Sequence, residues 1–262
     1  MSARPEPSEP RLYLAEMTTV EAERAVTDSP LVLLPAGAFE QHGPGLPLAT
    51  DLVRAERVAE RVAARLGGRA VIGPALPVGV SPHHLAFAGT LSLGVDTFRT
   101  VVHEYVEGLY RHGWRKVLVV TGHGGNNAAL TTVAQDLLAR RPDLEFAWTP
   151  LTALAADAVA AMDVREVSGH SGEAETAQML HLAPGLVRTG LLEAGTTALA
   201  ELDDLSRLAR RRGHPTLQVR YDRLSANGVL GDPARATDAD GAAIVAAIVD
   251  RITEFAEEWL KA

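Results

Sequence analysis

Two short apolar runs stand out in the pattern of hydrophobic and polar positions along this 262-residue chain. Residues 31–36 read LVLLPA and residues 116–121 read KVLVVT, and each run is followed at once by glycine. Apolar runs of this length without alternation are typical of strands buried on both faces of a parallel sheet. Shorter stretches at residues 70–72 and 145–149 predict two further strands.

Segments with helical periodicity separate and follow these runs. Their apolar positions recur every three or four residues, as on the buried face of a helix. The predicted helices cover residues 51–66, 97–112, 127–140, 173–181 and 238–259. This order of strands and helices predicts an open α/β sheet with helices on both faces. No repeat or linker divides the chain, so we expect one domain over residues 11–262, after a disordered, Pro-rich lead at residues 1–10.

Charge and hydropathy limit the class of partner. The chain has 33 Asp and Glu against 25 Lys and Arg, a net charge of -8, whereas nucleic-acid-binding proteins usually display basic stripes. The one dense basic cluster, residues 207–212, is typical of a solvated helix end. No apolar run approaches the roughly 20 residues that cross a membrane, and the start lacks a signal-type apolar region. We therefore expect a cytoplasmic protein with no nucleic-acid or membrane partner.

The sequence contains no cysteine, which restricts the chemistry of any site. Disulfides, thiolate-bound metals, iron–sulfur clusters and a cysteine nucleophile are excluded, so any metal must be held by His, Asp and Glu. Ligands of open α/β sheets gather beyond the carboxyl ends of the strands. The loops that follow residues 31–36 and 116–121 are therefore the first places to search for such side chains.

The first of these loops, FEQHGPGLPLATD at residues 39–51, contains Glu40, His42 and Asp51 among glycines and prolines. Glu40 and His42 are separated by one residue, which in extended backbone turns both side chains to the same side. A stiff backbone reduces the entropy lost when such donors are fixed on an ion. The alternative is that Asp51 caps the next helix and that the other two side chains are solvated.

The second loop, GHGGNN at residues 122–127, places His123 just after a buried strand. His123 is either a metal ligand or a polar residue in a tight turn. Gly124 and Gly125 would let a substrate approach backbone N–H groups, as in phosphate-binding loops. The loop matches neither a Walker loop nor a dinucleotide fingerprint. A sugar-phosphate or nucleotide site that uses this loop is a competing hypothesis.

Two further segments carry candidate side chains. HSGEAETAQM, residues 170–179, combines His170 with Glu173 and Glu175, which could supply a metal ligand and a general acid or base, or could only complement a helix dipole. Ser171 lacks the setting of a serine hydrolase nucleophile. His84, in SPHHLAFAGT, belongs either to a loop that lines a pocket or to a surface histidine pair.

Taken together, these segments resemble the creatininase (creatinine amidohydrolase) family. The resemblance is carried by YLAEMTTVEAE, GAFEQHGPGLPLATD, GVSPHHLAFAGTLSL, VLVVTGHGGNN and GHSGEAETAQMLHLAPGLV, in the order and spacing of the family. It covers most of residues 12–187, and the last 70 or so residues add little. It implies a three-layer α/β/α sandwich with a mostly parallel central sheet, in proteins that commonly assemble as homo-oligomers, namely hexamers.

The resemblance also implies two divalent metal ions per chain, zinc in the first place and manganese or iron as alternatives. Glu40 and His123 would hold one ion, His42 the other, and Asp51 both. Glu175, with Glu173 behind it, would replace an acid that creatinine-cleaving members have where this chain has Gly125. His170 and Glu173 are the candidate catalytic residues. The candidate substrate-binding residues are His84, Gly124, Gly125 and Asn126.

The activity implied by the resemblance is hydrolysis of a non-peptide or cyclic amide C–N bond in a small-molecule substrate, by water that two metals activate. Gly45, in place of a histidine seen in many relatives, and Gly125 argue against creatinine itself. The alternatives within the family are a formamide hydrolase, a peptidase that trims a modified peptide during cofactor maturation, and a C–C hydrolase of a keto-inositol. A non-catalytic member that binds a metal or ligand is the alternative outside enzymes.

Overall fold

The computed structural model describes residues 11–211 and 213–262. The lead expected at residues 1–10 and the last position of the basic cluster lie outside the described residues. Within the described part, one sheet has the strand order β2-β1-β3-β4, with every neighbouring pair parallel. The strands are β1 Leu31–Ala36, β2 Ala70–Ile72, β3 Lys116–Thr121 and β4 Glu145–Pro150. The parallel sheet predicted from the apolar runs is confirmed.

The helices follow the predicted periodicity, with ends displaced by at most two residues in the five predicted segments. Short helices that the periodicity did not predict occur near the start and between β4 and α10. The helices are α1 Thr19–Asp28, α2 Thr50–Arg65, α3 Val95–Arg111, α4 Asn127–Arg140, α5 Leu151–Leu154, α6 Ala156–Ala160, α7 Glu173–Leu182, α8 Asp204–Ala209, α9 Tyr221–Leu224 and α10 Asp238–Trp259.

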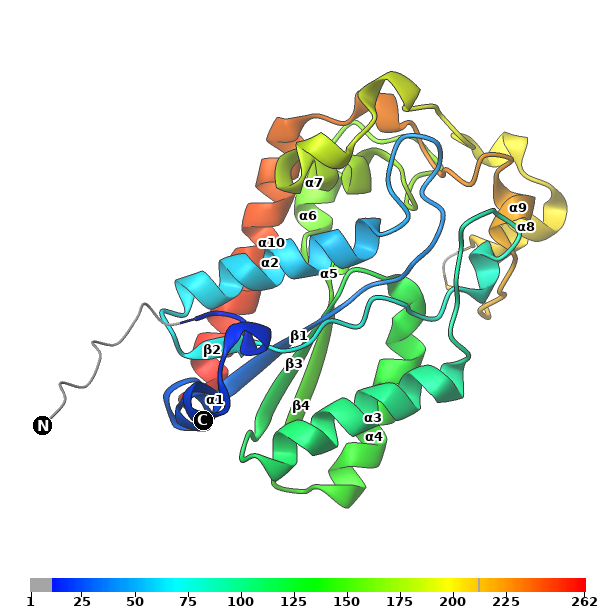
Figure 1. Cartoon of the computed structure of the whole chain (residues 1–262). Coiled ribbons are helices and arrows are strands. Elements are labelled where there is room, and N and C mark those ends of the chain that lie inside the picture. Colours follow the sequence, from blue (N-terminus) through cyan, green and yellow to red (C-terminus); the bar gives the residue numbers. More distant parts are fainter. Residues whose placement is uncertain (1–10, 212) are drawn as a thin grey trace, which may run out of the picture.

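Alternation along the central strands produces three layers. Leu31 and Leu33 of β1 enter a core cluster with residues of α2 and α10, whereas Val32 and Leu34 enter a second cluster with residues of α3 and α4. Successive side chains of a strand point to opposite faces, and both faces here are covered. Figure 1 shows α2 and α10 on one side of the sheet and α3 and α4 on the other. The α/β/α sandwich is therefore confirmed.

The register of the two central strands fixes where the connecting loops begin. Ala36 of β1 pairs with Thr121 of β3, so both strands end at the same edge of the sheet. The first turn of α2 packs directly on this edge, because a Cβ at Gly122 would overlap the backbone carbonyl of Asp51. Only glycine permits such a close approach. The two loops singled out in the sequence and the start of α2 are thereby brought together.

Of the helices in residues 11–211 and 213–262, none combines the length and the apolar character that a bilayer crossing requires.

Candidate metal centre

The acidic loop after β1 folds inward. Glu40, His42 and Asp51 are each only 1% exposed, so the alternative of solvated loop side chains is wrong. Asp51 is the second residue of α2 and does not cap it. Burying charged groups is costly unless opposite charges or metal ions compensate them. The position of these side chains therefore requires partners of opposite charge.

His123 supplies the first nitrogen donor. Its Nδ1 lies 3.3 Å from Glu40 Oε1 and 3.1 Å from Asp51 Oδ2. Its other ring nitrogen, Nε2, lies 3.0 Å from the backbone carbonyl of Val80. A carbonyl can only accept a hydrogen bond, so Nε2 carries the proton and the Nδ1 lone pair faces the two carboxylates. Metal-binding imidazoles commonly have this arrangement, in which a carbonyl hydrogen-bonded to one ring nitrogen leaves the other nitrogen to bind the metal.

His42 supplies the second nitrogen donor, and Glu175 faces it. His42 Nε2 lies 3.5 Å from Asp51 Oδ1 and 3.7 Å from Glu175 Oε2. His42 Nδ1 lies 3.2 Å from the carbonyl oxygen of Glu40 and donates to it, which leaves Nε2 free as a donor atom. The backbone N–H of Ser171 donates to Glu175 Oε2 at 2.7 Å and fixes that carboxylate.

Asp51 joins the two groups of donors through its two oxygens. Oδ2 lies on the His123 side and Oδ1 on the His42 side. A carboxylate shared in this way is the usual bridge in two-metal sites, where the ions lie about 3.5–4 Å apart. The donor set of imidazoles and carboxylates, without thiolates, suits zinc, manganese and iron.

The unpartnered polar atoms of the cluster test whether it fits metal ions. Both carboxylate oxygens of Glu40, Nε2 of His42 and Oδ2 of Asp51 are buried and have no hydrogen-bond partner among the described residues. Buried polar atoms are nearly always paired. Mixed groups of His, Asp and Glu donors lie within 4.8 Å of one another here. The residues present therefore fit divalent cations.

The pKa shifts of the histidines reflect the same demand for positive charge. Burial alone would lower the pKa of His42, but the carboxylates of Asp51, Glu175 and Glu40 outweigh it and raise that pKa to about 9. Burial would likewise lower the pKa of His123, but the adjacent carboxylates of Asp51 and Glu40 outweigh it and raise that pKa well above its ordinary value. Without an ion, the nitrogens of His42 and His123 that face the carboxylates therefore hold a proton, and a divalent ion would take the place of those protons.

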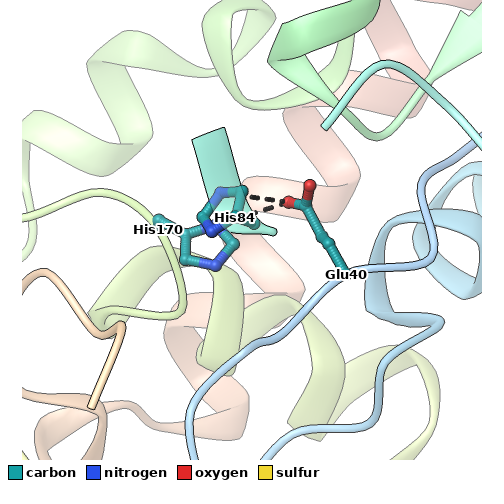
Figure 2. Close-up of side chains that lie close together, drawn as sticks. All are labelled: Glu40, His84 and His170. Atoms are coloured by element: carbon teal, nitrogen blue, oxygen red, sulfur yellow. Dashed lines mark ion pairs between the residues drawn. The ribbon is translucent and has the colours of Figure 1, made fainter. Parts of the chain in front are cut away.

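Two further histidine rings lie over Glu40, as Figure 2 shows. His84 Nε2 and His170 Nδ1 lie 3.6 and 3.7 Å from Glu40 Oε1. His170 Nε2 donates to the carbonyl oxygen of Gln41 at 2.8 Å, so Nδ1 carries the lone pair. Burial, and then repulsion by His42, lower the pKa of His170 to about 3. The His170 imidazole is therefore neutral near pH 7, and its Nδ1 can hold a proton only transiently.

A cavity of about 550 Å³ opens over this cluster. Its polar lining includes Glu40, Asp51, Glu175 and four histidines, and its apolar lining includes Pro150, Leu151, Ala153 and Val159. No lysine or arginine among the described residues lines it. A second cavity of about 400 Å³ shares His83, Gly124, Gly125 and Gln218 with the first. The two cavities adjoin along the 83 and 124–125 turns.

Two residues expected at the site do not line either cavity. Asn126 is fully buried, and its amide donates to the carbonyl oxygen of Gly37 and accepts from the backbone N–H of Val80. Glu173 is also fully buried, and its carboxylate accepts from the backbone N–H of Arg165. Asn126 therefore braces the turns behind the site, and the structure does not bring Glu173 to the reacting space. His84, Gly124 and Gly125 line the first cavity as expected.

At positions 45 and 125, neighbouring atoms lie too close for any residue larger than glycine. A Cβ at Gly125 would overlap His123 Nε2 and the carbonyl oxygen of Val80, so this backbone leaves no room there for an acidic side chain. A Cβ at Gly45 would come within 2.5 Å of the Leu192 side chain. The carboxylate for the second donor group therefore comes from α7 through Glu175.

Several residues of the site were not recognised in the sequence. Arg54 is fully buried and pairs with Asp51 and Glu175. Tyr221, from the last third of the chain, packs its ring 4.0 Å from that of His84, between ring centroids. Asn127, rather than Asn126, lines the cavity. The three-residue spacing from Asp51 was a usable signal for Arg54, but nothing local marks Tyr221.

A family model described as "Creatininase: Creatinine amidohydrolase" matches residues 15–256. The chain belongs to the creatininase family. The match extends well beyond the motifs in residues 12–187 and includes the segment that supplies Tyr221.

Individual relatives in the creatininase family differ in how much of this chain they match. The mycofactocin precursor peptide peptidase of Mycobacterium tuberculosis is 35% identical over 94% of this chain and 92% of its own length. The creatinine amidohydrolase of Pseudomonas putida is 34% identical, but over 44% of this chain and 46% of its own. A putative creatinine amidohydrolase from Bacteroides fragilis has the same fold, with a TM-score of 0.81, 24% identity and coverage of 96% and 97%.

Proposed function

We propose that this creatininase-family hydrolase cleaves an amide bond near the end of a precursor peptide, with two divalent metal ions. The shape of the site is the observation that carries the proposal. The cavity over the candidate metal centre shares lining residues with a second cavity, and two adjoining spaces suit an extended chain better than a single small ring. This choice replaces the non-peptide or cyclic amide favoured on the sequence alone.

Similarity to the relatives supports the same choice. The relative named for peptide cleavage matches nearly the whole of this chain, whereas the relative named for creatinine matches less than half of it at the same identity. Gly125 supports it as well, since an acid expected in creatinine-cleaving members does not fit there. The apolar residues that line the cavity offer a surface for an aliphatic or aromatic end residue.

The arrangement of the donor atoms supports two ion positions. Glu40, Asp51 and His123 would hold one ion, and His42, Asp51 and Glu175 the other. When bound, two such ions supply an activated water and polarise the amide carbonyl. The bridging role of Asp51 makes both positions depend on this residue.

The neighbouring histidines provide the proton transfer that amide hydrolysis needs. His170 Nδ1 can relay a proton to the leaving nitrogen, because its Nε2–H is held by the carbonyl of Gln41. The low pKa of the ring means that it passes this proton on and does not retain it. His84 is held in the opposite tautomer, since the Gln41 side-chain amide lies 2.9 Å from its Nδ1 and donates to it. His84 therefore directs an N–H from Nε2 towards the site.

The test is an assay of the purified protein loaded with zinc, manganese or iron(II) in turn. The substrates are a tripeptide and a hexapeptide that end in leucine, together with creatinine and a formamide. We expect close to two ions per chain and cleavage of the peptides, and we expect Glu40→Gln and Asp51→Asn to lose both. Turnover of creatinine without peptide cleavage, or full peptidase activity in a metal-free protein, would overturn the proposal.

A further inference from the structure

Arg54 is a fully buried charge at the metal centre that the proposed chemistry does not use. Its Nη1 donates to Glu175 Oε1 at 2.8 Å and to Asp51 Oδ1 at 3.3 Å. Both acids belong to the proposed second metal position. A buried guanidinium requires paired carboxylates and acceptors, and here the carboxylates that satisfy it are themselves proposed ligands.

The far side of the guanidinium is anchored on other elements. Nη2 donates to Thr152 Oγ1 of α5 at 2.6 Å and to Gln178 Oε1 of α7 at 3.1 Å, and Nε donates to the same Gln178 oxygen at 3.2 Å. Arg54 itself lies on α2, one turn after Asp51. The planar fork of donors thus has a fixed orientation relative to three helices.

This anchoring determines which carboxylate oxygen of Glu175 is available. Oε1 is taken by Arg54, while Oε2 accepts from Ser171 N–H and faces His42 Nε2 at 3.7 Å. With donors on both sides the carboxylate cannot rotate freely. The orientation of Glu175 Oε2 towards the second metal position is therefore fixed even without a bound ion.

We propose that Arg54 is a positioning residue that fixes the carboxylates of Glu175 and Asp51 and thereby sets the affinity for the second metal ion. The proposal rests on the proposed two-metal function, but it concerns ion binding and not the substrate. Arg54 acts through the two acids and does not line the cavity. Its effect is accordingly on ion occupancy and kcat, with little effect on KM.

The experiment compares Arg54→Met with Arg57→Met by cobalt(II) titration, followed through the visible absorption of the bound ion. Arg57 lies on the same helix, and its side chain is 50% exposed and pairs with Glu60. For Arg54→Met we expect the second ion to bind 10–100-fold more weakly, the usual effect of losing an outer-shell partner, with kcat lowered and KM almost unchanged. Arg54→Lys should recover part of the affinity, and Arg57→Met should match the wild type.

Two ions bound to Arg54→Met with wild-type affinity would overturn the proposal. If that variant does not fold, as judged by circular dichroism, Gln178→Met decides instead, because Gln178 Oε1 anchors Arg54 while its amide nitrogen donates to the carbonyl oxygen of Ala174 and not to Asp51 or Glu175. A several-fold weaker second ion is expected there, and an unchanged titration would refute the role of Arg54. A wild-type protein that binds two ions but cleaves no peptide would refute the proposed function alone.

Discussion

The histidines of the metal centre show how single residues are prepared for their chemistry. His42, His123 and His170 each place one ring nitrogen against a backbone carbonyl oxygen, at 3.2, 3.0 and 2.8 Å. Each carbonyl accepts a hydrogen bond from that nitrogen, so the other ring nitrogen, which faces the carboxylates, is the one available to bind an ion once it is unprotonated. The tautomers are thus set by the loop backbone, independently of any ion.

Gly122 is the residue at which this backbone tolerates least change. A Cβ there would overlap the carbonyl of Asp51, so Gly122→Ala should push the first turn of α2 away from the sheet edge and displace Asp51. We expect at least a tenfold loss of metal affinity, in line with the precision that ligand geometry demands. Equilibrium dialysis followed by metal analysis measures this loss.

Gly108 provides the matched control for that substitution. It lies inside α3, and a Cβ there meets nothing within 4 Å. Gly108→Ala should leave ion binding unchanged and stabilise the protein by roughly 0.5–1 kcal/mol, because alanine loses less conformational freedom in a helix. Equal loss of metal in both variants would show that the packing of α2 on the edge is not what holds Asp51.

At the level of elements, the phase of α7 decides which acid reaches the site. Residues two apart on a helix point in nearly opposite directions, since each residue turns by about 100°. Glu175 faces His42, whereas Glu173 accepts from the backbone N–H of Arg165 behind the site. Glu175 and Gln178, three residues apart, share the face that meets Arg54.

Some features of the fold and of the candidate site could be predicted from the sequence, and others could not. The central strands, the main helices and the loops at the sheet edge followed from local periodicity and from the rule on strand ends. The phase of α7 did not, because the acids lie in its first turn and the helix is apolar on several sides. Tyr221 could not be predicted for another reason. Its contacts with His83 and His84 join segments about 140 residues apart in the sequence.

The central strands carry the stability on which the site depends. Leu33 of β1 is fully buried in the core cluster beneath α2 and α10. Leu33→Ala should lower the free energy of unfolding by about 2–5 kcal/mol, through lost apolar burial and the cavity left behind. Denaturant unfolding measures the change. Leu138→Ala, at a position 73% exposed, should stay within about 0.5 kcal/mol of wild type, and a similar loss there would contradict this account.

On the scale of the whole molecule, the metal centre ties together segments that are distant in the chain. The loops after β1 and β3 and the start of α7 each contribute donors. Ions that bind only the folded state stabilise it, by about 2.7 kcal/mol for each ion present at 100 times its dissociation constant. Chelation should therefore lower the melting temperature by several degrees, measured by calorimetry. Asp51→Asn should show no such response, and an equal shift in that variant would mean that the ions bind elsewhere.

The two adjoining cavities predict a preference for longer peptides, which can be tested apart from the chemistry of the site. Ala128, on the first turn of α4, lines only the second cavity, so Ala128→Trp should fill part of its 400 Å³ and leave the metal ligands untouched. We expect KM for the hexapeptide to rise about tenfold, equivalent to losing about 1.4 kcal/mol of binding, while KM for the tripeptide stays constant. Leu138→Trp, on the same helix but exposed, controls for the added indole. If both peptides lose affinity equally, the substrate does not extend through the second cavity, and its chain must leave the metal centre by another route.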